Sequence, residues 1–311
     1  MSKLTPQQLE AKILKKKKDK INRNKFFEIF IATLVIGFIA IIFLLPIVLT
    51  VTNSFMAKTE ISANYGAVFG AGDSSIIFKN VNLKFIPDMV SFEQYITVLF
   101  KSPDYLFKFW NSVILVVPIV IGQILISIAA AYGLSRVKRK WKEVVFFTYI
   151  ILMLMPYQVT LVPNYLVADT LGILNTRWAI WLPGIFSPFA VYILTKYIRR
   201  IPISLIESAE LDGCNEWKIF WKIAFPLSKG SMASVGILIF IDYWNMVEQP
   251  KILLTDENLH PLSVFLSKIS EGEIGLAFAV ASIYMFLPLF VFLYGEEYLV
   301  EGISYQGGVK G

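Results

Sequence analysis

Long apolar runs alternate with short polar segments along this chain of 311 residues. A helix needs about 20 mostly apolar residues to cross a bilayer, and six runs come close to that length. We expect the spans at about residues 26–51, 109–134, 144–167, 178–197, 231–254 and 275–293. The pattern therefore predicts an all-α integral membrane protein, with one transmembrane domain over residues 26–300.

Two of these spans carry two prolines each. The third holds Pro156 and Pro163, and the fourth holds Pro183 and Pro188. Proline inside a span is tolerated where neighbouring groups or water satisfy the carbonyls that it frees. We therefore expect the third helix to be kinked or broken.

The segment between the first two spans, residues 54–107, has no window apolar enough to cross a membrane. It is longer than the other polar segments. We expect it to be an extracytoplasmic loop with short helices, such as one around Phe92–Phe100.

Basic residues gather at alternate ends of the spans. They occur in the tail of residues 1–25, at five of the eight positions 135–142, and at Lys196, Arg199 and Arg200. Short loops rich in Lys and Arg stay on the cytoplasmic side. This distribution predicts that both termini are cytoplasmic, the C-terminal one being a tail at 301–311. It also places the polar segment at residues 201–228 on the cytoplasmic side.

Composition supports a membrane protein and argues against several kinds of site. Hydrophobic residues make up 56% and charged residues 17% of the chain, whereas a soluble domain has roughly a quarter charged residues. The formal net charge of +6 is explained by topology, so we expect no nucleic-acid partner. With one cysteine, Cys214, and one histidine, His260, neither a disulfide framework nor a metal site is expected.

The polar segment reads as two short helices joined by a turn. Pro202 suits a first helical position, Ser204–Leu211 can form about two turns, and Gly213 suits the left-handed position that ends a helix. A second helix fits Asn215–Phe225, and we expect Asp212 to cap its start. Its apolar residues share one face and are Trp217, Phe220, Trp221 and Ala224. That face must pack on the spans, on the membrane surface or on a partner protein.

The residues of the polar segment also resemble a known family. Glu207-Ser208-Ala209-x-x-Asp212-Gly213, followed by Ile223-x-x-Pro226-Leu227, resembles the EAA loop of the permease subunits of ABC importers. Other parts of the chain are similar to the same family, namely Asn111-Ser112, residues 131–136, Met155-Pro156, residues 171–176, Trp244-Asn245 and the ending Val300-Glu301-Gly302…Gly308-Val309-Lys310-Gly311. Together they are most similar to the carbohydrate-uptake branch, resembling the six-span second membrane subunit of the maltose importer.

The resemblance implies the type I importer permease fold, in which cytoplasmic coupling helices contact an ATPase. The implied contacts to the ATPase are Glu207, Ser208, Ala209, Asp212, Gly213, Trp217, Phe220 and Trp221, with Gly308, Val309, Lys310 and Gly311 at the C-terminus. Glu207 would accept a charge-assisted bond from an arginine. The basic residues at 135–142 could also reach the ATPase, although topology already explains them.

The same resemblance implies the partners and the location. These are a second permease subunit in a heterodimer, two ATP-binding cassette subunits, an extracytoplasmic solute-binding protein and a sugar, in the cytoplasmic membrane of a bacterium. The chain has no G-x-x-x-x-G-K-[ST] phosphate loop, so ATP and Mg²⁺ are expected on the partner subunits and this chain is not expected to be an enzyme.

The chain departs from the family pattern at a few positions. Ser208 and Cys214 replace alanines, and Gly230 stands where a second proline is common. Residues 54–107 and the insertion Tyr305-Gln306 also add length. The substitutions exchange small residues and leave the two-helix interpretation intact.

Polar residues in the fifth span are candidates for the transport path. Asp242 in mid-span is expected to be functional or paired, because an unpaired charge there is costly. Trp244 and Asn245 could offer a ring face and a polar edge to a sugar, or could bond to neighbouring helices. A permease for peptides or amino acids remains an alternative function, and a secondary transporter is a more distant one.

Overall fold

The computed structural model describes residues 6–69, 82–137, 141–268 and 274–304. Regular structure in this part of the chain is helical, apart from an isolated antiparallel bridge between Met56 and Val90. The α-helices are α1 (Pro6–Asn53), α2 (Lys58–Phe69), α3 (Glu93–Ile96), α4 (Pro103–Arg136), α5 (Trp141–Met153), α6 (Tyr157–Thr170), α7 (Trp178–Gly184), α8 (Pro188–Ile198), α9 (Ile203–Leu211), α10 (Glu216–Ile219), α11 (Phe225–Leu227), α12 (Lys229–Trp244), α13 (Glu248–Leu253), α14 (Leu262–Leu266) and α15 (Ile274–Ser304). Short π-helical turns cover Thr97–Lys101 and Phe220–Ala224, and a 3-10 turn covers Glu257–Leu259.

Four helical stretches in the described part of the chain are long and apolar enough to cross a membrane. They are Lys25–Asn53, Pro103–Arg136, Trp178–Ile198 and Ile274–Leu299. Two further pairs of helices are each bent at a short break, and counting each pair as one span gives up to six. The four long stretches coincide with the first, second, fourth and sixth predicted spans.

The third predicted span is broken, as its prolines suggested. Helices α5 and α6 meet at an angle of 98° between Met153 and Tyr157. Pro156 has no N–H to continue the helix, and its ring disfavours helical backbone at the residue before it. Pro163, by contrast, lies inside α6 without breaking it.

The fifth predicted span, residues 231–254, is divided between two helices. Helix α12 ends at Trp244, and the Asn245 amide donates back to the Ile241 carbonyl at 2.8 Å. A continued helix would place Pro250 in its interior, where proline removes a hydrogen bond and clashes with the preceding turn. The chain instead starts a new helix, α13, in which Pro250 occupies the tolerant first turn.

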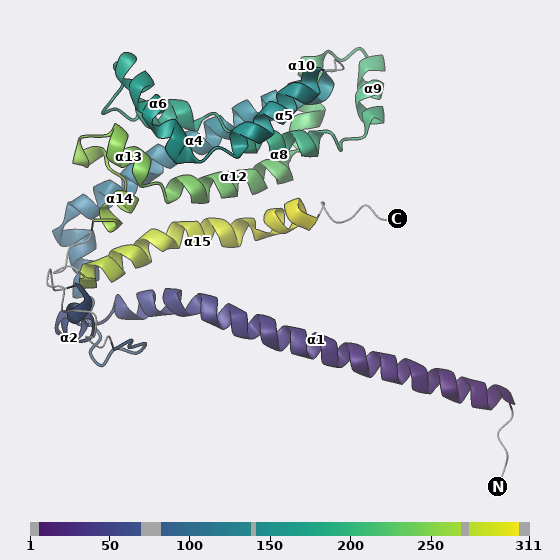
Figure 1. The fold of residues 1–311 in the computed structure, drawn as a ribbon, viewed down its shortest axis with the longest axis horizontal. Helices are drawn as coiled ribbons and strands as arrows, with labels where there is room; N and C mark the ends of the chain where they lie inside the picture. Colours follow the sequence, from purple (N-terminus) through teal and green to yellow (C-terminus); the bar gives the residue numbers. More distant parts are fainter. Residues whose placement is uncertain (1–5, 70–81, 138–140, 269–273, 305–311) are drawn as a thin grey trace, which may run out of the picture.

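The long helices form a bundle, and the two largest buried clusters lie within it. Helix α4 packs against α8 and α12, and α12 packs along α15 (Figure 1). One cluster lies where the C-terminal part of α4 meets α8 and the segment of residues 201–228, and the other surrounds Trp244. Figure 1 also shows α1 running away from the bundle, and its contacts lie chiefly with α15. The large apolar side chains of α1 between Phe26 and Val51 are therefore mostly exposed, and in a bilayer lipid would cover them.

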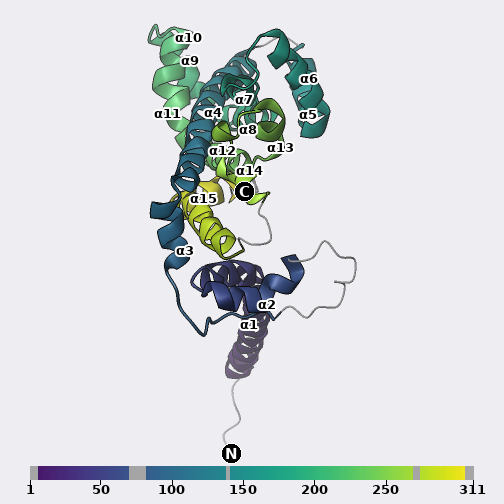
Figure 2. The same cartoon turned by 90° about the vertical axis from the view of Figure 1, so that its left-hand side faces the viewer.

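The segment predicted as an extracytoplasmic loop is folded back on the end of α1. The Ala57 N–H donates to the Met89 carbonyl at 3.1 Å, and the Ser91 N–H donates to Phe55 at 2.7 Å. A short helix does occur near Phe92–Phe100, formed by α3 and the π-helical turn that follows. This end of the molecule lies far from α9 and α10 (Figures 1 and 2).

Candidate functional site

The polar segment, residues 201–228, forms two helices joined by a tight turn at one end of the bundle (Figure 2). Helix α9 ends in a left-handed Gly213 with φ of +77°. The Gly213 N–H donates to Glu210 at 3.0 Å, and the Cys214 N–H donates to Ala209 at 2.9 Å. This pair of bonds satisfies the last carbonyls of a helix when glycine follows it, as the sequence predicted.

The second helix of the polar segment starts with a different cap from the one predicted. The Asn215 side chain accepts the Lys218 N–H at 2.9 Å, so Asn215 and not Asp212 satisfies a free donor at this start. Asp212 instead is the C-cap residue that follows Leu211 at the end of α9. The predicted continuous helix over Asn215–Phe225 also contains a π-helical turn, because Pro226 lacks the N–H that a regular turn would use.

One face of the polar segment is buried against the spans. Phe220 is 6% exposed, and its ring lies 5.2 Å from that of Tyr132 on α4. The other buried side chains of this face are Ile206, Ala209, Ile219 and Ala224, which pack with α4, α8 and α12. Phe220 therefore does not share an exposed face with Trp217 and Trp221, although the sequence grouped the three together.

An ionic network fixes the same face to the end of α4. Arg136 pairs with the carboxylates of Glu210 and Glu216, and its Nη2 lies 2.8 Å from Glu216 Oε1. The Tyr132 hydroxyl donates to Glu216 Oε2 at 2.5 Å. Sequence reasoning explained Arg136 by topology, with contact to the ATPase as the alternative. The signal that could have revealed its pairing was the pair of acidic residues, one on each helix of the polar segment.

The exposed side chains of the polar segment combine acidic and apolar groups. We call the set formed by Glu207, Leu211, Asp212, Trp217 and Trp221 the acid–aromatic face. Trp217 is 69% exposed and Leu211 is 89% exposed. The rings of Trp217 and Trp221 lie edge to face, with centroids 5.9 Å apart. Large exposed apolar side chains beside carboxylates are typical of a protein-binding surface.

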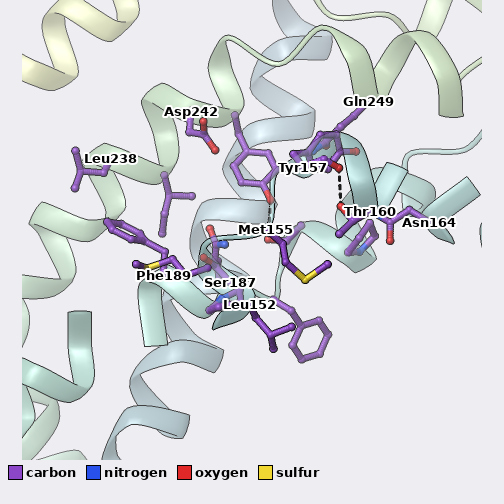
Figure 3. A pocket seen from close by; sticks show the side chains of 18 residues that line it. Leu152, Met155, Tyr157, Thr160, Asn164, Ser187, Phe189, Leu238, Asp242 and Gln249 are labelled. Atoms are coloured by element: carbon purple, nitrogen blue, oxygen red, sulfur yellow. Dashed lines mark hydrogen bonds between the residues drawn. The ribbon is translucent and has the colours of Figure 1, made fainter. Parts of the chain in front are cut away.

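A second candidate site is a pocket of about 670 Å³, which we call the central cavity (Figure 3). It is lined by Gln123, Leu152, Met153, Met155, Tyr157, Thr160, Asn164, Pro183, Gly184, Phe186, Ser187, Pro188, Phe189, Leu238, Ile239, Asp242, Tyr243 and Gln249. An adjoining pocket of about 600 Å³ shares Tyr157, Asp242, Tyr243 and Gln249 and adds Asn245 and Glu248.

The three polar candidates of the fifth span have different surroundings. Asp242 lines the central cavity and Asn245 lines the adjoining pocket. Trp244 lines neither, because it is fully buried between the rings of Phe240 and Tyr284. Its indole N–H donates to the Tyr284 carbonyl at 3.3 Å, which is the bonding to a neighbouring helix that the sequence left as its alternative.

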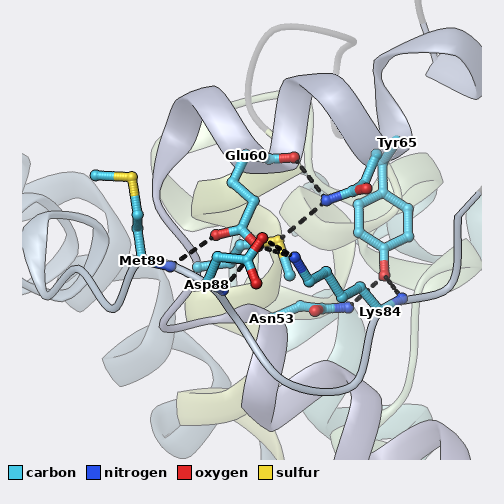
Figure 4. Close-up of polar contacts among 8 residues, drawn as sticks. Asn53, Glu60, Tyr65, Lys84, Asp88 and Met89 are labelled. Carbon is cyan, nitrogen blue, oxygen red and sulfur yellow. Dashed lines mark hydrogen bonds and ion pairs between the residues drawn. The ribbon is translucent and has the colours of Figure 1, made fainter.

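A third polar cluster lies at the far end of the molecule (Figure 4). The Glu60 carboxylate accepts the N–H groups of Asp88 and Met89 at 2.9 and 3.0 Å, and pairs with Lys84 at 2.9 Å. The Asp88 N–H, with help from Lys84, holds the pKa of Glu60 below its usual value. The carboxylates of Asp88 and Glu60 raise the pKa of Lys84. The cluster connects α2 to the segment before α3.

Other expected features are structural or lie outside the described residues. The His260 ring is buried and bonds to the Leu254 carbonyl at 2.8 Å. Within the described ranges, no group of three or more His, Cys, Asp and Glu residues could hold a metal ion. The C-terminal residues Gly308, Val309, Lys310 and Gly311 lie outside the described residues.

Comparisons with known proteins agree with this architecture. Residues 123–301 match the family model described as "Binding-protein-dependent transport system inner membrane component". The arabinooligosaccharides transport system permease protein AraQ of Halalkalibacterium halodurans is 28% identical, over 90% of this chain and 95% of that protein. AraQ of Bacillus subtilis is 30% identical, over 76% of this chain and 85% of the relative.

A solved structure has the same fold. It is a bacterial ABC transporter involved in the import of the acidic polysaccharide alginate. The superposition has a TM-score of 0.73 and covers 89% of this chain and 97% of the other, at 21% sequence identity.

Proposed function

Since the chain belongs to the family of binding-protein-dependent transport system inner membrane components, we propose that it is the permease subunit of an ATP-driven importer for a sugar or an oligosaccharide. Relatives named for arabinooligosaccharide transport support this substrate class. Two separate ATP-binding cassette subunits bind and hydrolyse ATP. A second permease subunit completes the path, and an extracytoplasmic solute-binding protein delivers the sugar.

The observation that carries the coupling mechanism is the two-faced packing of the polar segment. Its inner face is buried in the bundle, whereas its acid–aromatic face is open. An arginine of the ATPase would form a charge-assisted bond with Glu207, and an apolar cleft would receive Trp217 and Trp221. Ser208 and Asp212 border this contact, while Ala209 and Gly213 fix the shape of α9 and its turn.

Movement of the polar segment would reach the central cavity through shared helices. The segment packs on α4 and α8 and leads directly into α12. The same three helices provide Gln123, Phe189 and Asp242 to the cavity wall. When the ATPase subunits close on ATP, they would shift the polar segment and tilt these walls, so that the cavity changes the side of the membrane to which it opens.

Reversing the charge of Glu207 tests the coupling contact. We expect Glu207→Lys to lower ATP-dependent sugar uptake into proteoliposomes at least about tenfold, since losing a charge-assisted bond costs on the order of 1.5–3 kcal/mol. The variant should still assemble in the membrane, because Glu207 is exposed. Asp104→Lys, at the end of α4 far from the polar segment, is the matched control and should transport normally. Wild-type uptake by Glu207→Lys would refute the assignment.

Uptake from a mixed panel of solutes tests the substrate class. Cells that carry the complete importer should accumulate at least one labelled sugar and lose this uptake with Glu207→Lys. Accumulation of a peptide or an amino acid, and of no sugar, would replace the proposed substrate class by a non-sugar solute.

A further inference from the structure

Three breaks in membrane helices meet at the central cavity. One lies between Met153 and Tyr157, one between Gly184 and Pro188, and one follows Trp244 at the end of α12. Residues of all three breaks line the cavity or the pocket beside it. Irregular backbone at membrane depth is stable only where protein, water or a ligand satisfies its polar groups. The convergence indicates a polar compartment and not a packing defect.

Gln123 is the most deeply buried polar side chain at this cavity. It projects from α4 and is 2% exposed. Its Oε1 has no hydrogen-bond partner among the described residues. A buried acceptor without a partner costs about 1–3 kcal/mol. The Oε1 atom is itself buried, so a side-chain rotation that turns the amide into the cavity would let a hydrogen-bond donor on a ligand recover that free energy. A hydroxyl group is such a donor.

The other polar groups around the cavity are neutral. Figure 3 shows Tyr157, Thr160 and Asn164 of α6 on one side, with Gln249 of α13 beside them. Amides and hydroxyls both donate and accept hydrogen bonds, as the ring hydroxyls of a saccharide require. The apolar faces of Phe186 and Phe189 complete the wall and suit the C–H face of a sugar ring.

Charge is distributed unequally in this compartment. Among the described lining residues, Asp242 is the one charged side chain of the cavity, and Glu248 adds a second carboxylate in the adjoining pocket. No Lys, Arg or His is among these lining residues. A carboxylate on a ligand would need an arginine or lysine to replace its hydration, and would meet like charge instead.

We infer that the central cavity is a saccharide subsite that accepts neutral sugars and rejects sugars that carry a uronic acid. Gln123 accepts a hydrogen bond from a sugar hydroxyl, and Asp242 excludes an anionic ring. This inference rests on the proposed function and specifies the substrate class of the same permease.

Protection of an engineered cysteine tests the inference without the solute-binding protein, whose own selectivity would otherwise dominate. Cys214 is the single cysteine of the chain, so Cys214→Ser with Thr160→Cys places one thiol at the cavity. Proteoliposomes that hold this chain with the second permease subunit and the ATPase subunits, but without the solute-binding protein, are treated with a maleimide in the presence of galactotriose or trigalacturonate, and of mannotriose or trimannuronate. Each pair differs only in the oxidation of C6. Arabinotriose is a third neutral probe.

At least one neutral trisaccharide should slow labelling, and the uronates should not. Gln123→Leu should raise the concentration of that sugar needed for half-protection about tenfold, because the amide acceptor is lost. Asp242→Asn should lower the concentration at which the matching uronate gives half-protection about tenfold, because the like charge is removed. Ser127→Ala is the control, since Ser127 is also buried on α4 without a partner among the described residues but does not line the cavity.

Protection by the uronates that equals or exceeds protection by the neutral sugars would overturn the inference, and so would the absence of protection by every saccharide. Uptake of a sugar by the intact importer in either case would leave the proposed function standing. Failure of the proposed function would appear separately, as uptake of no sugar at all.

Discussion

Gly213 has the backbone conformation on which the polar segment depends. Its φ of +77° lies in the left-handed region, where a side chain with a Cβ costs roughly 1–2 kcal/mol and asparagine is tolerated better than other residues. An added Cβ would meet no atom within 4 Å. Any defect from a substitution here is therefore conformational and not a steric clash.

We expect Gly213→Val to impair coupling and Gly213→Asn to retain it. Valine is branched at Cβ and disfavours a positive φ, so α9 and α10 would lose their relative orientation. ATP-dependent uptake should fall severalfold for valine and stay near wild type for asparagine. Faster maleimide labelling of the half-buried Cys214 would report the local opening. Equal uptake by both variants would show that the turn geometry does not matter.

Trp244 also shows how one residue can have two interpretations. Beside Asn245 it could be a sugar platform, but its ring is fully buried among Phe109, Phe240 and Tyr284. Asn245, one position later, is exposed and lines a pocket. Successive residues of a helix point about 100° apart, so one faces the core and the next faces the pocket.

At the scale of elements, α2 is held to the chain before α3 by polar contacts. Glu60 of α2 accepts two backbone N–H groups, and Lys84 bridges it to Asp88. Near the end of α1, Asn53 donates to the Tyr65 hydroxyl at 2.6 Å. These bonds give the 54–107 segment a defined structure before residue 70 and after residue 81.

This contact should weaken in acid. The folded pKa of Glu60 is depressed, so its stabilising contribution is complete above the unfolded value of about 4.3. The contribution is lost as the pH falls through the folded pKa. We expect the Asp88 and Met89 amides to stay protected from hydrogen exchange between pH 7 and 5, after correction for intrinsic rates, and to lose protection below about pH 4.

Glu60→Gln should lower the protection of these amides at neutral pH and remove its pH dependence. Glu93→Gln, a nearby exposed glutamate, is the control and should behave as wild type. Protection that stays constant down to the lowest pH in wild type would show that the carboxylate does not hold this segment.

At the scale of the whole molecule, the acid–aromatic face and the central cavity are connected by common helices. Arg136 joins the end of α4 to α9 and to α10 through Glu210 and Glu216. Gln123 of the same helix lines the cavity. A force on the polar segment can therefore reach the cavity without any change within α4.

We expect Arg136→Gln to weaken transmission while leaving the acid–aromatic face intact. ATPase subunits should still dock and hydrolyse ATP, but the sugar transported per ATP should fall about fivefold, the factor that about 1 kcal/mol gives. Lys142→Gln, a basic residue at the start of α5, is the control. If transport and hydrolysis fell together in Arg136→Gln, the residue would act on docking and not on transmission.

Much of the molecule follows from the sequence alone. Apolar runs of about 20 residues have few stable alternatives to membrane helices, so four long helices appear where the sequence placed spans. Pro156 broke the third span because it has no N–H, and Gly213 ended α9 because a positive φ favours glycine. These outcomes depend on local chemistry, and the residues that decide each of them lie within one short segment of the sequence.

Only the tertiary structure decided which side chains meet. Arg136 and Glu216 are 80 residues apart in sequence, and nothing local distinguishes their pairing from a basic cluster that sets topology. Phe220 and Trp217 carry the same apolar signal, but the bundle buries the first and leaves the second open. Gln123 looks like an ordinary polar residue within a span until the breaks of other helices surround it with a cavity. Burial and pairing are properties of the packed helices together, because each depends on what the neighbouring helix presents.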